Sequence, residues 1–107
     1  MKILLSFLVC LFATLSFSQK KLSGHVTDES NLPIPYAEVF IKNNTELRTL
    51  ADVDGNFSLQ LFPGEYFVIF RASGYTEREG YVTILNSDVV KDMQLFPMRS
   101  NEIEEVE

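Results

Sequence analysis

The sequence contains one cysteine, one histidine and no tryptophan. Cys10 lies in an apolar N-terminal run, so the remaining chain has no thiol for a disulfide or a metal site. His25 has no second histidine or cysteine with which to form a metal site or a catalytic triad. We therefore expect no catalytic residue, no metal and no cofactor, and we interpret His25 as a solvent-facing strand residue.

Basic residues are also scarce. Nine lysines and arginines stand against fifteen aspartates and glutamates, which gives a formal net charge of −6. Four of the acids crowd the C-terminus, at Glu102, Glu104, Glu105 and Glu107. Binding to nucleic acid requires a basic face, so nucleic acid is excluded as an expected partner.

The first 18 residues have the pattern of a secretory signal peptide. Lys2 is followed by an uncharged apolar run over residues 3–17, which is too short to span a bilayer comfortably. Small residues end the run, and we predict cleavage between Ser18 and Gln19. Loss of Lys2 leaves a mature chain of 8 − 15 = −7 charges, with no cysteine and no transmembrane segment. Without disulfides, the stability of the mature chain must come from its hydrophobic core. An exported domain that has no disulfide fits a bacterial periplasm.

The mature chain has no helical periodicity and instead shows short alternating apolar runs between turn signals. Seven strands are expected, at residues 20–27, 37–41, 47–51, 57–62, 66–72, 80–84 and 89–95. The runs 57–62 and 66–72, joined by Pro63–Gly64, are predicted to form a β-hairpin. Strands of this number and spacing favour a β-sandwich or a small barrel. The predicted inward residues are Leu22, Val26, Ala37, Val39, Ile41, Phe57, Leu59, Leu61, Tyr66, Val68, Phe70, Val82, Ile84, Met93 and Leu95. Lys91 falls on the same face, and we expect it at the exposed start of the last strand.

One acidic motif resembles the start of a calcium-binding loop. Asp52-x-Asp54-Gly55 has the start of such a pattern, but an EF-hand loop needs glycine at its sixth position and glutamate at its twelfth. This chain has Phe57 and Pro63 there. We interpret the motif as a hairpin turn.

Several motifs together carry a family resemblance. They are SGHVTD at residues 23–28, PIPYAEV at 33–39, ADVDGNFSL at 51–59, PGEY at 63–66 and SGY at 73–75. In this order and spacing the mature sequence resembles the carboxypeptidase regulatory-like domain. The resemblance implies a transthyretin-like sandwich of seven antiparallel strands over residues 19–97, followed by an acidic flexible tail at 98–107. The catalytic domain of the carboxypeptidases is absent, so no peptidase activity is implied. Tyr36 departs from the family pattern, which usually has a small residue there, and Ala51 replaces a more common threonine.

The same resemblance suggests a setting. In Bacteroidetes this domain commonly begins TonB-dependent outer-membrane receptors, ahead of plug and barrel. Residues 101–107 (NEIEEVE) look like the segment that leads toward the TonB box. The implied function is a non-enzymatic accessory domain in the periplasm or at the outer membrane, whose partner is a protein such as a receptor component. A truncated receptor and a stand-alone module both stay open.

A glycan-binding module is the alternative, because sandwiches of this kind also carry starch-binding-like sites. Sugar sites favour exposed aromatic platforms. With no tryptophan in the chain, Tyr36, Tyr75 and Tyr81 are the available substitutes.

Three apolar side chains are candidates for a docking face. Alternation places Phe67 and Ile69 opposite the inward residues of their strand, and Phe40 likewise points outward from residues 37–41. Exposed together, they would form a patch for a protein partner. The competing interpretation is that neighbouring strands cover them as ordinary packing.

The export signal gives the first prediction. Mass spectrometry of the protein recovered from the periplasm should find Gln19 at the N-terminus, cyclised to pyroglutamate. Periplasmic protein that still carries residues 1–18 would contradict the proposed cleavage.

Overall fold

The computed structural model describes residues 18–98, and every regular element in that range is a strand. The strands are β1 (Lys20–Thr27), β2 (Glu38–Ile41), β3 (Asn44–Leu50), β4 (Asn56–Leu61), β5 (Gly64–Arg71), β6 (Arg78–Ile84), β7 (Val89–Val90) and β8 (Met93–Gln94). No helix between residues 18 and 98 has the length and hydropathy to cross a membrane. The predicted signal peptide and most of the predicted acidic tail lie outside the described residues.

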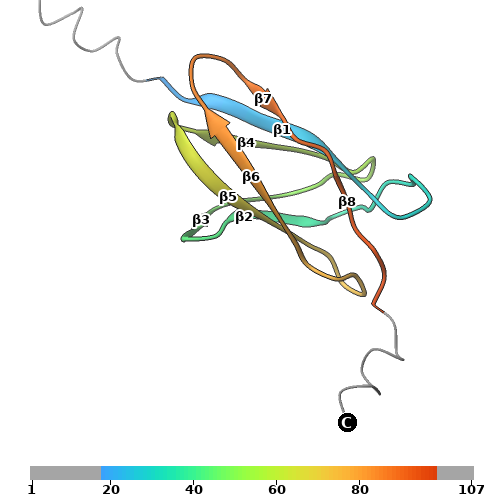
Figure 1. Ribbon diagram of the computed structural model, residues 1–107. Helices are drawn as coiled ribbons and strands as arrows, with labels where there is room; N and C mark the ends of the chain where they lie inside the picture. Colours follow the sequence, from blue (N-terminus) through green and yellow to red (C-terminus); the bar gives the residue numbers. More distant parts are fainter. Residues whose placement is uncertain (1–17, 99–107) are drawn as a thin grey trace, which may run out of the picture.

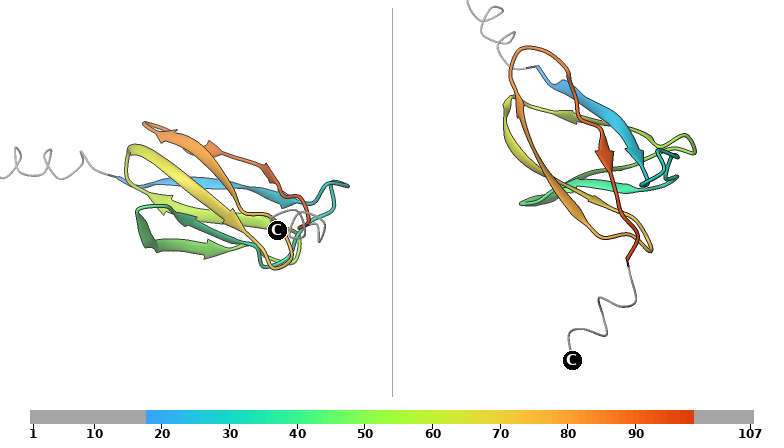
Figure 2. Two further views of the ribbon diagram at one scale, coloured as in Figure 1. Left: turned by 60° about the horizontal axis from the view of Figure 1, so that its bottom comes forward. Right: turned by 45° about the vertical axis from the view of Figure 1, so that its right-hand side comes forward.

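The strands form two sheets that pack as a sandwich. One has the order β4-β1-β7, with β8 also pairing β1, and the other has the order β3-β2-β5-β6. Figure 1 shows β1 lying between β4 and β7. The two ends of the described chain lie at opposite ends of the molecule (Figure 2). The predicted β-sandwich is therefore confirmed.

Alternating side chains from both sheets meet in the core. Phe57 of β4 and Phe70 of β5 lie edge to face with ring centroids 5.6 Å apart, an arrangement that aromatic quadrupoles favour. All the predicted inward residues are buried except Tyr66, which is half-buried. The Tyr66 hydroxyl donates to the Phe62 carbonyl at 2.7 Å, which ties down the connection between β4 and β5.

The predicted hairpin of residues 57–62 and 66–72 is wrong. β4 pairs with β1, whereas β5 pairs with β2 and β6, so Pro63–Gly64 carries the chain from one sheet to the other. An L-Pro-Gly pair favours type I or II turns, whose twist splays strands instead of pairing them. The period-two alternation correctly predicts which face of each strand is buried, but it does not predict which strand is the neighbour.

The Asp52 motif forms a turn that also crosses between sheets. Oδ1 of Asp52 accepts hydrogen bonds from the amides of Asp54 and Asn56, both at 2.9 Å. Gly55 completes the turn with φ 80°, a conformation that glycine adopts without steric cost. The predicted turn is confirmed. It does not form a hairpin, because it joins β3 to β4 in the other sheet.

The last predicted strand is split, and it runs parallel to β1. β7 and β8 both pair with β1 in the parallel sense, so the expectation of a wholly antiparallel sandwich is corrected here. The Lys91 amide, between the two pieces, donates to the Ser23 carbonyl at 2.8 Å. This edge lies so close to Gly24 that an added Cβ there would stand 2.0 Å from the Lys91 carbonyl oxygen.

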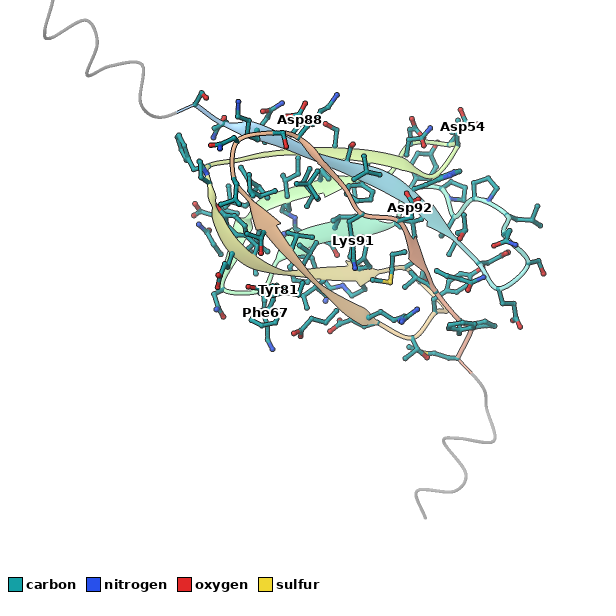
Figure 3. The ribbon with its side chains drawn as sticks, turned by 45° about the horizontal axis from the view of Figure 1, so that its top comes forward. Asp54, Phe67, Tyr81, Asp88, Lys91 and Asp92 are labelled. Carbon is teal, nitrogen blue, oxygen red and sulfur yellow. The ribbon has the colours of Figure 1, made fainter. Side chains whose placement is uncertain are left out.

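Lys91 is consequently not at an exposed strand start. Its side chain is half-buried, and its Cε lies 3.0 Å from where a Cβ on Gly80 of β6 would stand. The aliphatic stem thus covers a gap that Gly80 leaves between the edges of the two sheets, a common arrangement for long charged side chains. Figure 3 shows Lys91 on this connection between β7 and β8.

The connection over residues 28–35 folds back onto β1. The Asp28 carboxylate accepts from the amides of Ser30 and Leu32 at 2.8 and 3.0 Å. The Ile34 amide donates to the Val26 carbonyl at 3.0 Å, and the Ile34 side chain is buried. Ile34 and Ala51 are core residues absent from the predicted inward set; Ile34 lies in a connection between strands, and Ala51, predicted as the end of a strand, follows the end of β3.

The β4 register gives the second prediction. Leu59→Ala should leave a core cavity and lower the free energy of unfolding by about 2–5 kcal/mol, because Leu59 is buried. Ser58→Ala, on the exposed face of the same strand, should be nearly neutral. Equal melting temperatures for the two variants would show that the register is shifted by one residue.

Candidate functional site

The outer face of the β3-β2-β5-β6 sheet carries the predicted docking residues. The register pairs Glu38 with Arg71 and Phe40 with Ile69 across β2 and β5. It pairs Phe67 with Tyr81 and Ile69 with Glu79 across β5 and β6. The outer side chains therefore stand in rows across the sheet, and Phe40, Phe67 and Ile69 belong to one face.

Ile69 is not available on that face. It points outward from β5 but is only 5% exposed, so its predicted role as an exposed docking residue is corrected. Phe40 and Glu79 flank it in register. Long side chains that form ion pairs stand in the adjoining rows, and their stems cover apolar surface. Phe40 is itself half-buried, with the Arg71 guanidinium 4.9 Å from its ring centroid.

Phe67 keeps its predicted exposure and has an aromatic neighbour. Phe67 is 45% exposed and Tyr81 is 48% exposed. Their ring centroids lie 5.2 Å apart at a tilt of 54°, and Figure 3 labels the two side by side on β5 and β6. The Lys42 ammonium stands 5.8 Å from the centroid of the Phe67 ring. We name Phe67 and Tyr81 the aromatic pair.

Tyr81 was missed as a member of this face, although it was named as a glycan platform. Finding it needs the β5–β6 register, which places it opposite Phe67. Its own strand gives only the weaker signal that Tyr81 points away from Val82 and Ile84.

The charges around the aromatic pair are largely matched. Oε1 of Glu38 accepts from Arg71 at 2.7 Å, and its Oε2 contacts Arg48. Lys42 bridges to Glu79 at 3.1 Å. The Lys42–Glu79 pair is solvent-exposed, so it contributes little to stability. The Glu38 side chain is only 18% exposed between its two arginines. No nucleophile lies beside a base in these ion pairs, so they form a polar surround and not a catalytic arrangement.

An open pocket of about 560 Å³ lies at the end of the same face. Its lining residues include Tyr36, Glu38, Leu50, Arg71, Tyr75 and Glu77. Two of the three tyrosines named as glycan platforms are thus brought together. Tyr81 lies apart from them, with Phe67.

His25 and the acidic turn form no metal centre. His25 is half-buried, and its Nε2 lies 2.6 Å from the Asp54 carbonyl oxygen, so its ring contacts the turn between β3 and β4. Over residues 18–98 there is no group of three or more histidine, cysteine, aspartate or glutamate side chains that could hold a metal ion. Ser18 and Gln19, the predicted cleavage residues, are exposed, and the cleavage itself stays a prediction.

The fold and the motifs together define a small β-sandwich with no assembled reactive group among its described residues. A family model for the carboxypeptidase regulatory-like domain matches residues 21–95, which is well over half of the chain. The chain belongs to that family.

One curated relative is a TonB-dependent receptor. The chain is 32% identical over 62 residues to TonB-dependent receptor P39 of Formosa agariphila. The match covers 58% of this chain and 6% of the receptor, so the chain spans a small part of its relative's length.

Solved structures support the sandwich fold. A type II cohesin–X-dockerin complex from Acetivibrio cellulolyticus includes a chain that aligns with a TM-score of 0.62 at 16% identity, over 73% of this chain and 58% of that one. The Bacillus anthracis TIE protein aligns with a TM-score of 0.62 at 18% identity, over 75% of this chain and 17% of that one. A DUF3823 family protein from Bacteroides ovatus aligns with a TM-score of 0.58 at 17% identity, over 75% and 45%. At these identities the likeness is one of fold.

The different burial of Ile69 and Phe67 gives the third prediction. Ile69→Ala should lower the free energy of unfolding by about 2 kcal/mol, since a buried side chain is truncated. Phe67→Ala should cost clearly less, because much of its ring is already in water. Urea unfolding of both variants measures this difference, and a greater loss for Phe67→Ala would contradict the burial of Ile69.

Proposed function

We propose that this protein is an exported, non-enzymatic accessory domain that binds a protein partner through the aromatic pair Phe67–Tyr81. The observation that carries the proposal is the exposure of two aromatic rings in contact, within a face whose neighbouring charges are paired. Its setting is the periplasm or the outer membrane of a Bacteroidetes bacterium. The kinship with a TonB-dependent receptor supports that setting.

The aromatic pair has the chemistry of an interface centre. Tyrosine and phenylalanine are enriched at protein interfaces, where their rings supply large contact areas at a low cost in conformational entropy. Lys42, Glu79 and Glu65 stand around the pair and would form the polar rim of such an interface. Water contact with two large rings is unfavourable, so a partner that covers them gains free energy.

The partner we propose is a component of an outer-membrane receptor. The family is also found as part of a TonB-dependent receptor, in which this domain is a small fraction of the chain. A surface that contacts the remainder of such an assembly would need an apolar centre and charges of both signs at its rim. The face around Phe67 and Tyr81 offers both.

An enzymatic role has no support among the described residues. His25 contacts a backbone carbonyl, and the carboxylates of Glu38 and Glu79 are engaged by arginine or lysine. A general base needs to lie within reach of a nucleophile or a bound water in a defined site. The carboxypeptidase regulatory-like family membership agrees with a binding role.

Loss of the aromatic pair gives the fourth prediction. Phe67→Ser combined with Tyr81→Ser should keep the fold, because both side chains lie on the outer face, and should abolish crosslinking to the partner. The measurement is chemical crosslinking in cells that export the protein, with the adduct identified by mass spectrometry. An adduct that contains an outer-membrane receptor component, present in the wild type and absent in the variant, is the expected result.

A matched control separates a specific face from general surface apolarity. Val53→Ser with Val90→Ser also removes two exposed apolar side chains, 60% and 71% exposed, from other parts of the surface. This control should leave the adduct intact. An adduct unchanged in the Phe67 and Tyr81 variant, or lost equally in the control, would reject the proposed face.

A further inference from the structure

Tyr36 has a strained backbone. Its φ is 63°, in the left-handed region that glycine enters freely and bulky residues rarely occupy. The conformation is held from both sides, because the Tyr36 amide donates to the Ala51 carbonyl at 3.0 Å and the Ala51 amide donates to the Ala37 carbonyl at 2.8 Å. A glycine would fit this position without strain.

The strain is not offset by packing. Tyr36 is 64% exposed, so its ring contributes little to the core. Residues held in unfavourable backbone conformations concentrate at binding and catalytic sites, where the side chain is needed in one place. An exposed ring at a strained position therefore points to a contact outside the domain.

The ring stands at an open pocket of about 560 Å³ that contains a second tyrosine, Tyr75. Tyr75 is held in place by backbone contacts. Its amide donates to the Ala72 carbonyl at 3.1 Å, and it forms an isolated bridge with Pro97. Two aromatic side chains, one exposed and one half-buried, thus line a single pocket.

The polar groups of the pocket are ordered before any ligand arrives. Arg71 lies between two carboxylates, with Nη2 at 2.7 Å from Glu38 Oε1 and Nη1 at 3.9 Å from Glu77 Oε1. Arg48 contacts the second oxygen of Glu38, so two arginines balance two glutamates and the cluster has no net charge, which favours a neutral ligand over a charged one. Guanidinium donors and carboxylate acceptors side by side match the hydroxyl group, which both accepts and donates hydrogen bonds.

We propose that this pocket, formed by Tyr36, Tyr75, Arg71, Glu38 and Glu77, binds a neutral saccharide. The tyrosine rings would contact the apolar face of a sugar ring. Arg71 and the two glutamates would form hydrogen bonds with its hydroxyl groups. The volume falls within the usual range for small-ligand sites, roughly 300–1,000 Å³. The open shape suits a short stretch of a longer glycan chain.

This site is separate from the proposed docking face. Phe67 precedes Arg71 by four residues along β5, which corresponds to about 13 Å of extended strand. Neither Phe67 nor Tyr81 lines the pocket. Saccharide binding can therefore fail while protein docking holds, and the reverse is also true.

Tyr36→Gly tests the proposal because strain and binding should respond in opposite directions. Relief of the left-handed strain should raise the melting temperature by several degrees, as expected for a domain of this size. Loss of the ring should weaken saccharide binding at least tenfold. The measurements are thermal unfolding and calorimetric titration of the full chain, with soluble neutral oligosaccharides selected beforehand on a glycan array.

Two further variants complete the experiment. Tyr36→Asn keeps a residue that tolerates positive φ but lacks the ring, so it should lose binding in the same way. Tyr81→Ala removes a tyrosine outside the pocket and should bind the saccharide like the wild type. No binding to any neutral glycan on the array would overturn the proposal, as would unchanged affinity in Tyr36→Gly. Binding of a hexalysine peptide in place of a saccharide would overturn it as well and assign the pocket to a basic peptide segment.

Discussion

The packing of β4 against β5 across the sandwich is the interaction on which the rest of this structure depends. Phe57 and Phe70 meet edge to face at its centre, and the buried residues of both sheets gather around them. Because no cysteine follows Cys10, no disulfide can join the two sheets, and this apolar contact is the main interaction that holds them together. The inner faces are thus committed to stability, and any function is left to the outer faces and the sheet ends.

The sequence was informative about faces and less so about neighbours. Period-two alternation placed Leu59 and Val68 in the core, and the Asp52–Gly55 segment was correctly predicted as a turn. Alternation is the same in a hairpin and in two strands that face each other across a sandwich, so the partner of β4 could not be deduced from it. The parallel pairing of β7 and β8 depends on the close approach of the Lys91 carbonyl to Gly24, a tertiary contact with no local signal.

The candidate sites show the same limit. Alternation predicted that Phe67 and Ile69 point outward, yet their exposure differs because Ile69 lies between Phe40 and Glu79 whereas Phe67 lies beside Tyr81. The order of the strands in the sheet decides which outward residue is covered. This order cannot be predicted from the alternation of apolar and polar residues. Tyr36 was recognisable as a departure from the family pattern, but its left-handed backbone and its position beside Tyr75 follow only from the fold.

The ion pairs divide the outer sheet face, so its exposed aromatic rings do not form one continuous apolar patch. Glu38 forms ion pairs with both Arg48 and Arg71. The Arg71 guanidinium also lies over the ring of Phe40, so these side chains hold one another in place. Glu38 and Arg71 line the Tyr36 pocket, and the row of Phe40, Ile69 and Glu79 lies between them and the aromatic pair. Polar side chains held in fixed positions keep the two apolar surfaces from merging into one large patch, which would favour indiscriminate association. If both proposals hold, each surface would select its own ligand by shape and by the charges at its rim.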